Sequence, residues 1–279
     1  MNRTINNELT DRFAAFLIEN ERSRATISKY LHDLGTFACF AGEREIDKNV
    51  VVAYKEDLSK RYEITSANSM LAALNAFFRF AEWYDCIIRQ FKVQKRVFCE
   101  EKRELKEGEF KRLISTAESE KNDRISMVIQ TICGTGIRVS ELSYFTVETV
   151  KTGTVIITCK GKTRKVMIVK KLKEKLLAYA KKHRIATGQI FVTKNGKTLD
   201  RSNIWREMKK LCKSAGVCAK KVFPHNLRHL FARAFYKIEK DIAKLADILG
   251  HSSINTTRIY IVSTGEEHRR QLEKMKLIE

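Results

Sequence analysis

The cysteines of this chain form none of the patterns that mark a metal centre or a disulfide framework. The seven cysteines, at positions 39, 86, 99, 133, 159, 212 and 218, are odd in number, scattered, and include no Cys-x-x-Cys pair. Zinc ribbons and small disulfide-bonded folds require paired, regularly spaced cysteines. We therefore expect most of these residues to be small buried apolar side chains, and we predict neither a metal nor a cofactor.

Long apolar stretches are also missing. No run approaches the roughly 18 apolar residues that a membrane span requires. The N-terminus, MNRTINNELTDRF, lacks the apolar centre of a secretory signal. These absences predict a cytoplasmic protein that has no membrane partner.

Acidic residues are scarce in one part of the chain only. Residues 1–98 hold 15 Lys/Arg and 13 Asp/Glu, whereas residues 151–221 hold 21 basic side chains and three acidic ones. Apolar periodic stretches interrupt this basic block, so we interpret it as folded surface. A folded surface this basic indicates a polyanionic partner, in the first place nucleic acid. The alternative is a basic face that only keeps the protein soluble.

The chain of 279 residues is long enough for two domains, and its first part has helical periodicity. Residues 1–91 predict a bundle of four or five helices, with Thr26 and Ser66 at the positions of N-caps. The segments that carry apolar residues at three-to-four spacing are LTDRFAAFLIE, TISKYLHDLGTFACFAG, NVVVAYKEDLSKRY and SANSMLAALNAFFRFAEWY.

A charged stretch at residues 92–104 breaks this periodicity and predicts a linker. The remainder, residues 105–279, mixes helices with two β-rich runs around a turn at Lys160–Thr163. The only proline, Pro224, precedes HNLRHLFARAFYKI, as proline does at helix starts. The predicted helices lie near 107–118, 122–133, 171–184, 201–214, 225–237 and 241–249. The predicted fold class is therefore mainly α with a small β-sheet: a helical bundle followed by an α+β domain.

The stretch GTGIRVSEL contains two glycines but is no phosphate-binding loop, because it lacks the third glycine and the Gly-Lys-Ser/Thr ending. The glycines more simply stop one helix and start another, which presents Arg138 at the turn. Glu141 lies three residues further and can hold Arg138 in place. An ordinary surface ion pair is the alternative.

The stretch PHNLRHLFAR places His225 and Arg228 on one face at the start of a helix. His229 follows His225 by four residues, a spacing that can bind zinc. However, Asn226 stands where the zinc-protease pattern needs a glutamate, and no third ligand is evident. We therefore interpret His229 as a half-buried packing residue.

The stretch LGHSSINTTRIY brings His251 and Tyr260 around a polar segment. Gly250 fits a helix C-cap, and Ser253 can cap the next helical turn. Taken singly, His251 and Tyr260 have ordinary structural interpretations. Together with the arginines, His225 and a hairpin lysine, they supply the cations, base, acid and nucleophile that metal-free phosphoryl transfer needs.

The order TGIRVSEL, CKGKTRKV, HNLRHLFA and LGHSSINTTRIY resembles the tyrosine recombinase, or phage integrase, family, and is most similar to its short Xer-type members. The resemblance covers nearly the whole chain, because TISKYLHDLGTFACF and MLAALNAFFRFAEW resemble the core-DNA-binding helices of that family. The positions that match the catalytic set of the family are Arg138, Lys160, His225, Arg228, His251 and Tyr260.

The resemblance implies a role for each of these residues. Tyr260 would attack the scissile phosphate, with His225 as the base. Arg138 and Arg228 would bind the phosphate, as would His251. Lys160, preferred over Lys162, would protonate the departing 5′ oxygen. A 3′-phosphotyrosyl bond would conserve the energy of the cleaved bond, so that neither ATP nor a metal is required.

The resemblance further implies double-stranded DNA with paired core sites as the substrate, a four-way junction, and a homotetramer on DNA. Two alternatives remain open. One is a topoisomerase IB-like enzyme that reseals the strand it cut, and the other is a catalytically inactive DNA-binding regulator.

The last 19 residues, IVSTGEEHRRQLEKMKLIE, predict a tail helix with Leu272, Met275 and Ile278 on one stripe. This stripe would pack either on its own domain or on a neighbouring protomer.

Overall fold

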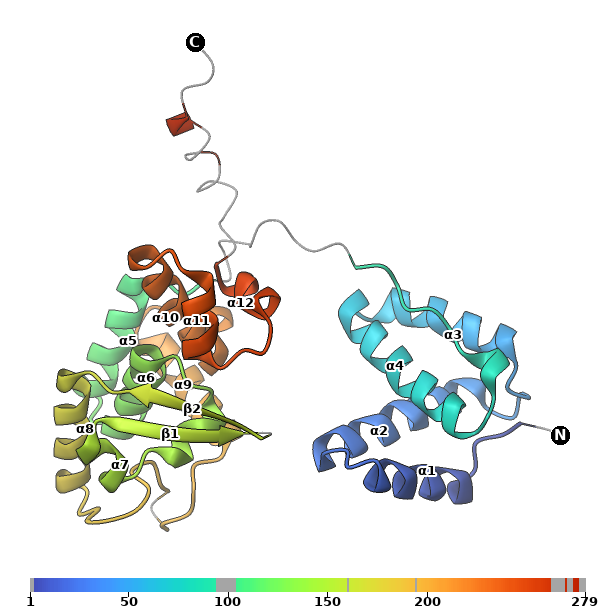
Figure 1. Cartoon of the computed structure of the whole chain (residues 1–279), viewed down its shortest axis with the longest axis horizontal. Helices are drawn as coiled ribbons and strands as arrows, with labels where there is room; N and C mark the ends of the chain where they lie inside the picture. The colour runs from blue at the N-terminus through green and yellow to red at the C-terminus, as the bar shows by residue number, and fades with distance from the viewer. Residues whose placement is uncertain are drawn as a thin grey trace. The chain divides into compact units, whose positions relative to one another are not determined.

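The chain divides into two compact units, Met1–Lys95 and Arg96–Glu279 (Figure 1). We call them the N-terminal unit and the C-terminal unit. The computed structural model describes residues 3–93, 104–159, 161–193, 195–261, 269 and 273–275. The predicted linker at residues 92–104 and the predicted tail helix lie mostly outside these residues.

The N-terminal unit is a bundle of helices, as the apolar periodicity predicts. Its described elements are α1 (Asn7–Glu19), α2 (Arg24–Ala41), α3 (Lys48–Arg61), α4 (Ile64–Phe80) and the short 3₁₀ helix η1 (Tyr84–Cys86). Aromatic rings fill its core. Phe13 meets Phe77 edge to face at 5.3 Å between ring centroids, and Phe37 meets Tyr54 in the same way at 5.0 Å. Such pairs add specific geometry to the burial of large apolar area.

Both predicted N-caps of this unit are wrong. Helix α2 begins after Ser23, whose hydroxyl accepts a hydrogen bond from the Thr26 amide. Helix α4 begins after Glu63, and the Ser66 amide donates to the Glu63 carbonyl. In each case the helix begins several residues before its first buried side chain, so the periodicity of the buried face places the start too late.

In the C-terminal unit a small hairpin packs one face against helices (Figure 1) and leaves Ile156 and Met167 exposed on the other. The predicted class, mainly α with a small sheet, is confirmed. Its described elements are α5 (Glu107–Ser119), α6 (Asp123–Thr135), η3 (Val139–Tyr144), α7 (Val147–Thr152), β1 (Thr154–Cys159), β2 (Lys162–Met167), α8 (Lys170–Lys182), α9 (Arg201–Ser214), η4 (Ala219–Lys221), α10 (Pro224–Ile238), α11 (Ile242–Leu249) and α12 (Ile254–Ile261).

The hairpin turn is shorter than predicted. Strands β1 and β2 are antiparallel, and their register extends through Thr158↔Thr163 to Cys159↔Lys162. Thr163 therefore belongs to β2, and the turn lies between Cys159 and Lys162. Gly161 has a φ of +73°, as tight hairpin turns demand.

Two glycines end helices at the centre of this unit. Gly136 closes α6 and Gly250 closes α11, each in the left-handed conformation with a φ of 66°. A Cβ at Gly136 would lie 2.4 Å from a ring carbon of Phe231 on α10. The absence of a side chain at Gly136 thus lets the end of α6 approach α10. Each glycine also lies just before a residue of the candidate site, Arg138 after Gly136 and His251 after Gly250.

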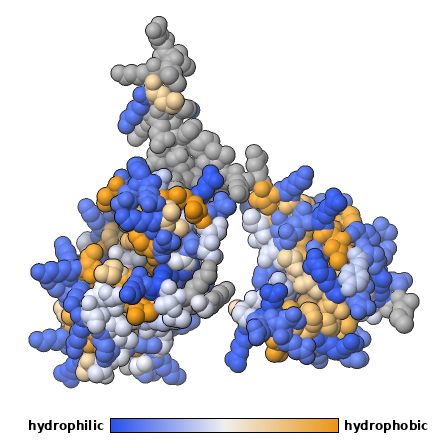
Figure 2. Space-filling view, viewed as in Figure 1, coloured by the Kyte–Doolittle hydropathy of each residue, from blue (hydrophilic) through white to orange (hydrophobic). Residues whose placement is uncertain are grey.

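Across the described ranges, no helix has the length and apolar character needed to cross a membrane. Figure 2 shows largely hydrophilic faces on both units, with hydrophobic side chains interspersed.

Candidate active site

Tyr260 lies near the end of α12 and is only 5% exposed. The predicted cap is confirmed, because the Ser253 hydroxyl accepts from the Asn255 amide at 3.3 Å. The Tyr260 hydroxyl lies 3.3 Å from Nε2 of His225. Its ring stacks on His229, with 4.1 Å between centroids. A phenol is thus held next to an imidazole nitrogen, a nucleophile–base geometry.

His225 is positioned by the start of α10, where Pro224 occupies the first turn as predicted. Part of its side chain is exposed, yet burial lowers the pKa of His225 below its ordinary value, and the charges of Arg228 and Arg138 lower it further. The ring is therefore neutral near pH 7. A neutral imidazole can accept the proton of a phenol.

Arg228 is almost completely buried, at 1% exposure. Its terminal nitrogens donate to the carbonyls of Gly136 at 2.6 Å and Leu249 at 2.7 Å. Burial, followed by repulsion from Arg138, lowers the pKa of Arg228 to about 10, so it still carries a charge near neutral pH. The two glycine-terminated helices thus fix this cation through their last carbonyls.

His251 connects Arg228 to α12. Nη2 of Arg228 lies 2.8 Å from Nε2 of His251, and Nδ1 of His251 lies 2.8 Å from the Thr257 hydroxyl. Because an arginine only donates, Nε2 is the acceptor, and the ring proton belongs on Nδ1. Burial first, and then the charge of Arg228, lower the pKa of His251 to about 4. His251 is therefore neutral in this arrangement.

Arg138 begins η3, and Glu141 holds it as predicted. The Arg138 amide donates to one Glu141 oxygen at 2.7 Å, and Nη1 donates to the other at 3.0 Å. Nη2 approaches the Gly250 carbonyl at 3.5 Å. The Arg138 side chain remains 41% exposed, whereas that of Glu141 is 4% exposed. A solvent-facing cation therefore stands beside the turn that carries His251.

The sequence interpretation missed Arg164 on β2. Both of its terminal nitrogens donate to the two carboxylate oxygens of Glu141, at 2.9 and 2.8 Å. Burial alone would raise the pKa of Glu141, but the hydrogen bonds from Arg164 and from the Arg138 amide outweigh it and lower the pKa. The strand alternation contains a signal, because Arg164 shares its face with the buried Val166 and Ile168. A charged residue at an inward strand position requires a partner.

His229 is half-buried, as predicted, but its contact with Tyr260 was not anticipated. Burial, and then the neighbouring charges, lower the pKa of His229 to about 3, so it packs as a neutral ring. Thr257 was noted only as part of a polar stretch. It is completely buried and lies one helical turn before Tyr260, which explains its reach to His251.

The structure brings five of the six predicted residues together: Arg138, His225, Arg228, His251 and Tyr260. Lys160 lies outside the described residues, and so does the side chain of Lys162. In the part of the chain that the structure describes, no three His, Cys, Asp or Glu side chains are grouped so that they could hold a metal ion.

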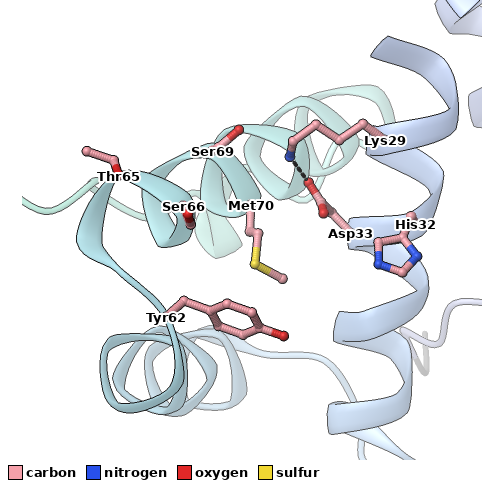
Figure 3. Close-up of a pocket in the computed structure, with 8 residues that line it drawn as sticks. All are labelled: Lys29, His32, Asp33, Tyr62, Thr65, Ser66, Ser69 and Met70. Carbon is pink, nitrogen blue, oxygen red and sulfur yellow. Dashed lines mark hydrogen bonds and ion pairs between the residues drawn. The ribbon is translucent and has the colours of Figure 1, made fainter. Parts of the chain in front are cut away.

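The N-terminal unit contains a separate pocket of about 420 Å³ between α2 and the start of α4 (Figure 3). Lys29 and Asp33 form an ion pair at its edge, and Asp33 is 5% exposed. Tyr62, Ser66 and Ser69 line the opposite side. No hydrogen-bonded pair of nucleophile and base lines the pocket among the described residues, so the candidate active site is the C-terminal cluster.

Comparison with protein families finds two matches. The phage integrase family matches residues 103–267, and the phage integrase N-terminal SAM-like domain matches residues 10–84.

Relatives extend over nearly the whole chain. It is 30% identical to tyrosine recombinase XerA of Pyrococcus horikoshii, over 99% of this chain and 96% of that protein. It is 31% identical to XerA of Thermococcus kodakarensis, over 98% of this chain and 97% of that protein. Tyrosine recombinase XerD of Chlamydia pneumoniae is 29% identical over 90% of each chain.

Solved structures show the same fold. A crystal structure of XerA recombinase has a TM-score of 0.55 and 27% identity, and the match covers 98% of this chain and 99% of that one. XerH recombinase bound to difH substrate gives a TM-score of 0.70, with 18% identity and coverage of 96% and 89%. A lambda integrase tetramer bound to a Holliday junction gives 0.73, with 18% identity and coverage of 91% and 76%.

Proposed function

The chain belongs to the phage integrase family and is a tyrosine recombinase, and from this premise we propose that it cleaves and rejoins DNA at specific sites through a 3′-phosphotyrosyl intermediate, without metal or ATP. The observation that carries the proposal is the 3.3 Å approach of the Tyr260 hydroxyl to Nε2 of His225, beside the buried Arg228. We assign core-DNA binding to residues 1–91 and catalysis to residues 105–279, with residues 92–104 as the linker.

In the proposed cleavage step, the Tyr260 oxygen attacks the scissile phosphorus and its proton passes to Nε2 of His225. A bond forms between the phenol oxygen and phosphorus, and the bond from phosphorus to the 5′ oxygen breaks. Lys160 donates a proton to that leaving oxygen, which departs as a 5′ hydroxyl. Rejoining runs in reverse, with a 5′ hydroxyl as the nucleophile, so that no external energy source is needed.

Three side chains would stabilise the charge that develops on the phosphate. Arg138 offers a guanidinium that faces solvent, and Arg228 offers a fixed, buried one. Cations placed in advance around a developing charge are among the strongest catalytic devices. Nε2 of His251 accepts from Arg228 in this structure, but the Thr257 hydroxyl can donate as well as accept. His251 can therefore change tautomer and donate from Nε2 to a phosphate oxygen instead of accepting from Arg228.

We extend the proposal to strand exchange between paired core sites, through a four-way junction, by a homotetramer on double-stranded DNA. The identity to Xer recombinases and the strongly basic stretch at residues 151–221 support this extension. The fold similarity to a recombinase tetramer on a Holliday junction agrees with it.

The test uses a duplex with a nick close to the cleavage point. After cleavage, the short fragment that carries the new 5′ hydroxyl diffuses away, so rejoining cannot occur and the covalent intermediate accumulates. Full-length protein should form an adduct that migrates slowly on a denaturing gel, and a chelator should not reduce it. Loss of the adduct on chelation, with recovery on adding Mg²⁺ or Zn²⁺, would contradict the metal-free step. Binding without an adduct would identify an inactive DNA-binding protein. On a supercoiled plasmid with two sites, relaxation without exchange between the sites would favour the topoisomerase-like alternative.

A further inference from the structure

Arg164 comes from the hairpin, yet it makes the closest carboxylate pair in the site. On β2 it lies opposite the buried Ile157, and its side chain is 13% exposed. Both terminal nitrogens reach both oxygens of Glu141, at 2.9 and 2.8 Å. Such a bidentate ion pair is the strongest geometry available to an arginine and a carboxylate.

Glu141 is shared by two arginines. Its two oxygens accept four hydrogen bonds, two from Arg164 and two from the backbone and side chain of Arg138. Arg164 donates to Glu141 from both terminal nitrogens, whereas Arg138 donates to it from only one. The pair with Arg164 therefore satisfies the buried negative charge and leaves the guanidinium of Arg138 41% exposed at the site.

Arg164 also lies against the turn that precedes His251. A Cβ added at Gly250 would lie 2.7 Å from Cδ and 2.8 Å from Nη1 of Arg164. One side chain thus contacts both the anchor of Arg138 and the backbone that presents His251.

We propose that Arg164 is a positioning residue for the phosphate site: it neutralises Glu141 and so keeps Arg138 available to the DNA. Without Arg164, Arg138 would be the nearest cation to the buried Glu141 carboxylate. Both terminal nitrogens of Arg138 would then donate to Glu141 in a bidentate ion pair. Arg138 would then face inward and lose donors for the phosphate. This inference depends on the proposed function, because it concerns the same cleavage step.

The test measures the single-turnover rate of adduct formation on the nicked duplex, with enzyme in saturating excess. Arg164→Met should slow cleavage by about 10- to 100-fold, the range expected for loss of charge-assisted contacts. Arg164→Lys should fall between Arg164→Met and the wild type, because an ammonium still neutralises Glu141 but cannot form the bidentate pair. Lys111→Met is the control, since it removes an exposed charge of the same unit outside the basic stretch at residues 151–221, and it should cleave almost normally.

The decisive variant combines Arg164→Met with Glu141→Gln. Removing both charges takes away the anion that would capture Arg138, so cleavage should recover by at least about tenfold over Arg164→Met. The fraction of protein that reacts reports folding separately from the rate. A 5′-thio leaving group, which needs no proton, should not rescue Arg164→Met.

A wild-type rate in Arg164→Met would overturn the inference, as would a double variant no faster than Arg164→Met. Full rescue by the 5′-thio substrate would also overturn it, because Arg164 would then act on the leaving group. A wild-type chain that forms no adduct would instead overturn the proposed function itself.

Discussion

The two units bury different kinds of side chain. The N-terminal unit fills its interior with aromatic rings such as Phe13, Phe37 and Phe77. The C-terminal unit has an aliphatic core and, beside it, a buried polar cluster that includes Glu141, Arg228 and Thr257. Apolar packing tolerates changes of pH but not cavities, whereas buried charges depend on every partner staying in place. The free energy of unfolding of the N-terminal unit should therefore depend mainly on the volume of its buried side chains. That of the C-terminal unit should depend on the charge and protonation of its buried polar groups.

The two tryptophans allow each unit to be followed separately, because Trp83 lies in the N-terminal unit and Trp205 in the C-terminal one. Fluorescence of a Trp205→Phe background reports the first unit, and that of a Trp83→Phe background reports the second.

The largest effect is expected for Arg228→Met. The change leaves the carbonyls of Gly136 and Leu249 buried without their donor and removes a cation from the phosphate site. We expect cleavage to fall by about 1,000-fold or more and the C-terminal unit to lose about 3–5 kcal/mol. Single-turnover cleavage and urea unfolding through Trp205 measure these changes.

The exposed Arg206 provides the matched control. Arg206→Met removes the same charge without burying an unpaired group, and it should unfold like the wild type. Equal destabilisation by both variants would show that net charge, and not the buried cluster, governs this unit.

The next effect concerns the first unit. Phe77→Ala removes a fully buried ring that contacts both Phe13 and Trp83. We expect the N-terminal unit to lose about 3–5 kcal/mol, measured by urea unfolding through Trp83. The C-terminal unit should unfold at an unchanged urea concentration, and a parallel loss there would mean that the units are not energetically separate.

A smaller effect is expected for Gly250→Ala, for which Gly153→Ala is the control. Both glycines have positive φ, +66° and +77°, so both substitutions carry backbone strain. Only at Gly250 would the new methyl group collide with Arg164, whereas a Cβ at Gly153 would have nothing within 4 Å. Gly250→Ala should destabilise the C-terminal unit by about 1–3 kcal/mol more than the control does. Equal losses in urea unfolding would contradict the close approach of Arg164.

The smallest effect is a dependence on pH. The pKa of His251 is lowered to about 4 and that of His229 to about 3, and the pKa of His225 is also lowered. An unfolded histidine has a pKa of about 6.5, so the unfolded chain takes up protons first and acid favours unfolding. The C-terminal unit should lose at least about 1 kcal/mol as the pH falls from about 6.5 towards 4.

Urea unfolding through Trp205 at pH 7.5, 6.0 and 5.0 measures this loss. Unfolding through Trp83 should change less over the same range. A C-terminal unit whose unfolding free energy is constant from pH 7.5 to 5.0 would show that these histidines are not held neutral.

Local patterns in the sequence predict much of this structure, and long-range hydrogen bonds account for what they miss. Helices and strands repeat their apolar residues at fixed periods, so most elements are found to within a few residues. The motif spacing singled out five residues that the structure brings into one cluster. By contrast, the pairing of Arg164 with Glu141 joins positions 23 residues apart, and the stacking of His229 on Tyr260 joins two helices. No local period encodes such contacts.

Helix starts show the same limit on a smaller scale. The hydroxyl of Ser23 caps α2, although Thr26 lies nearer to the apolar stripe. Polar residues can occupy either the cap or the first turn, so composition alone does not distinguish them. An inward-facing charge, as at Arg164, was the one local signal that could have revealed a missing partner.

The most direct test of the whole account is the identity of the residue that carries the DNA. Tyr260→Phe removes a single oxygen and should bind the duplex as tightly as wild type while forming no adduct. Tyr236→Phe, which changes another tyrosine of the same apolar cluster, should form the adduct normally. After digestion of the wild-type adduct, mass spectrometry should find the nucleotide on the peptide that contains Tyr260. A 3′-linked adduct in Tyr260→Phe, or a nucleotide on another residue, would contradict the account.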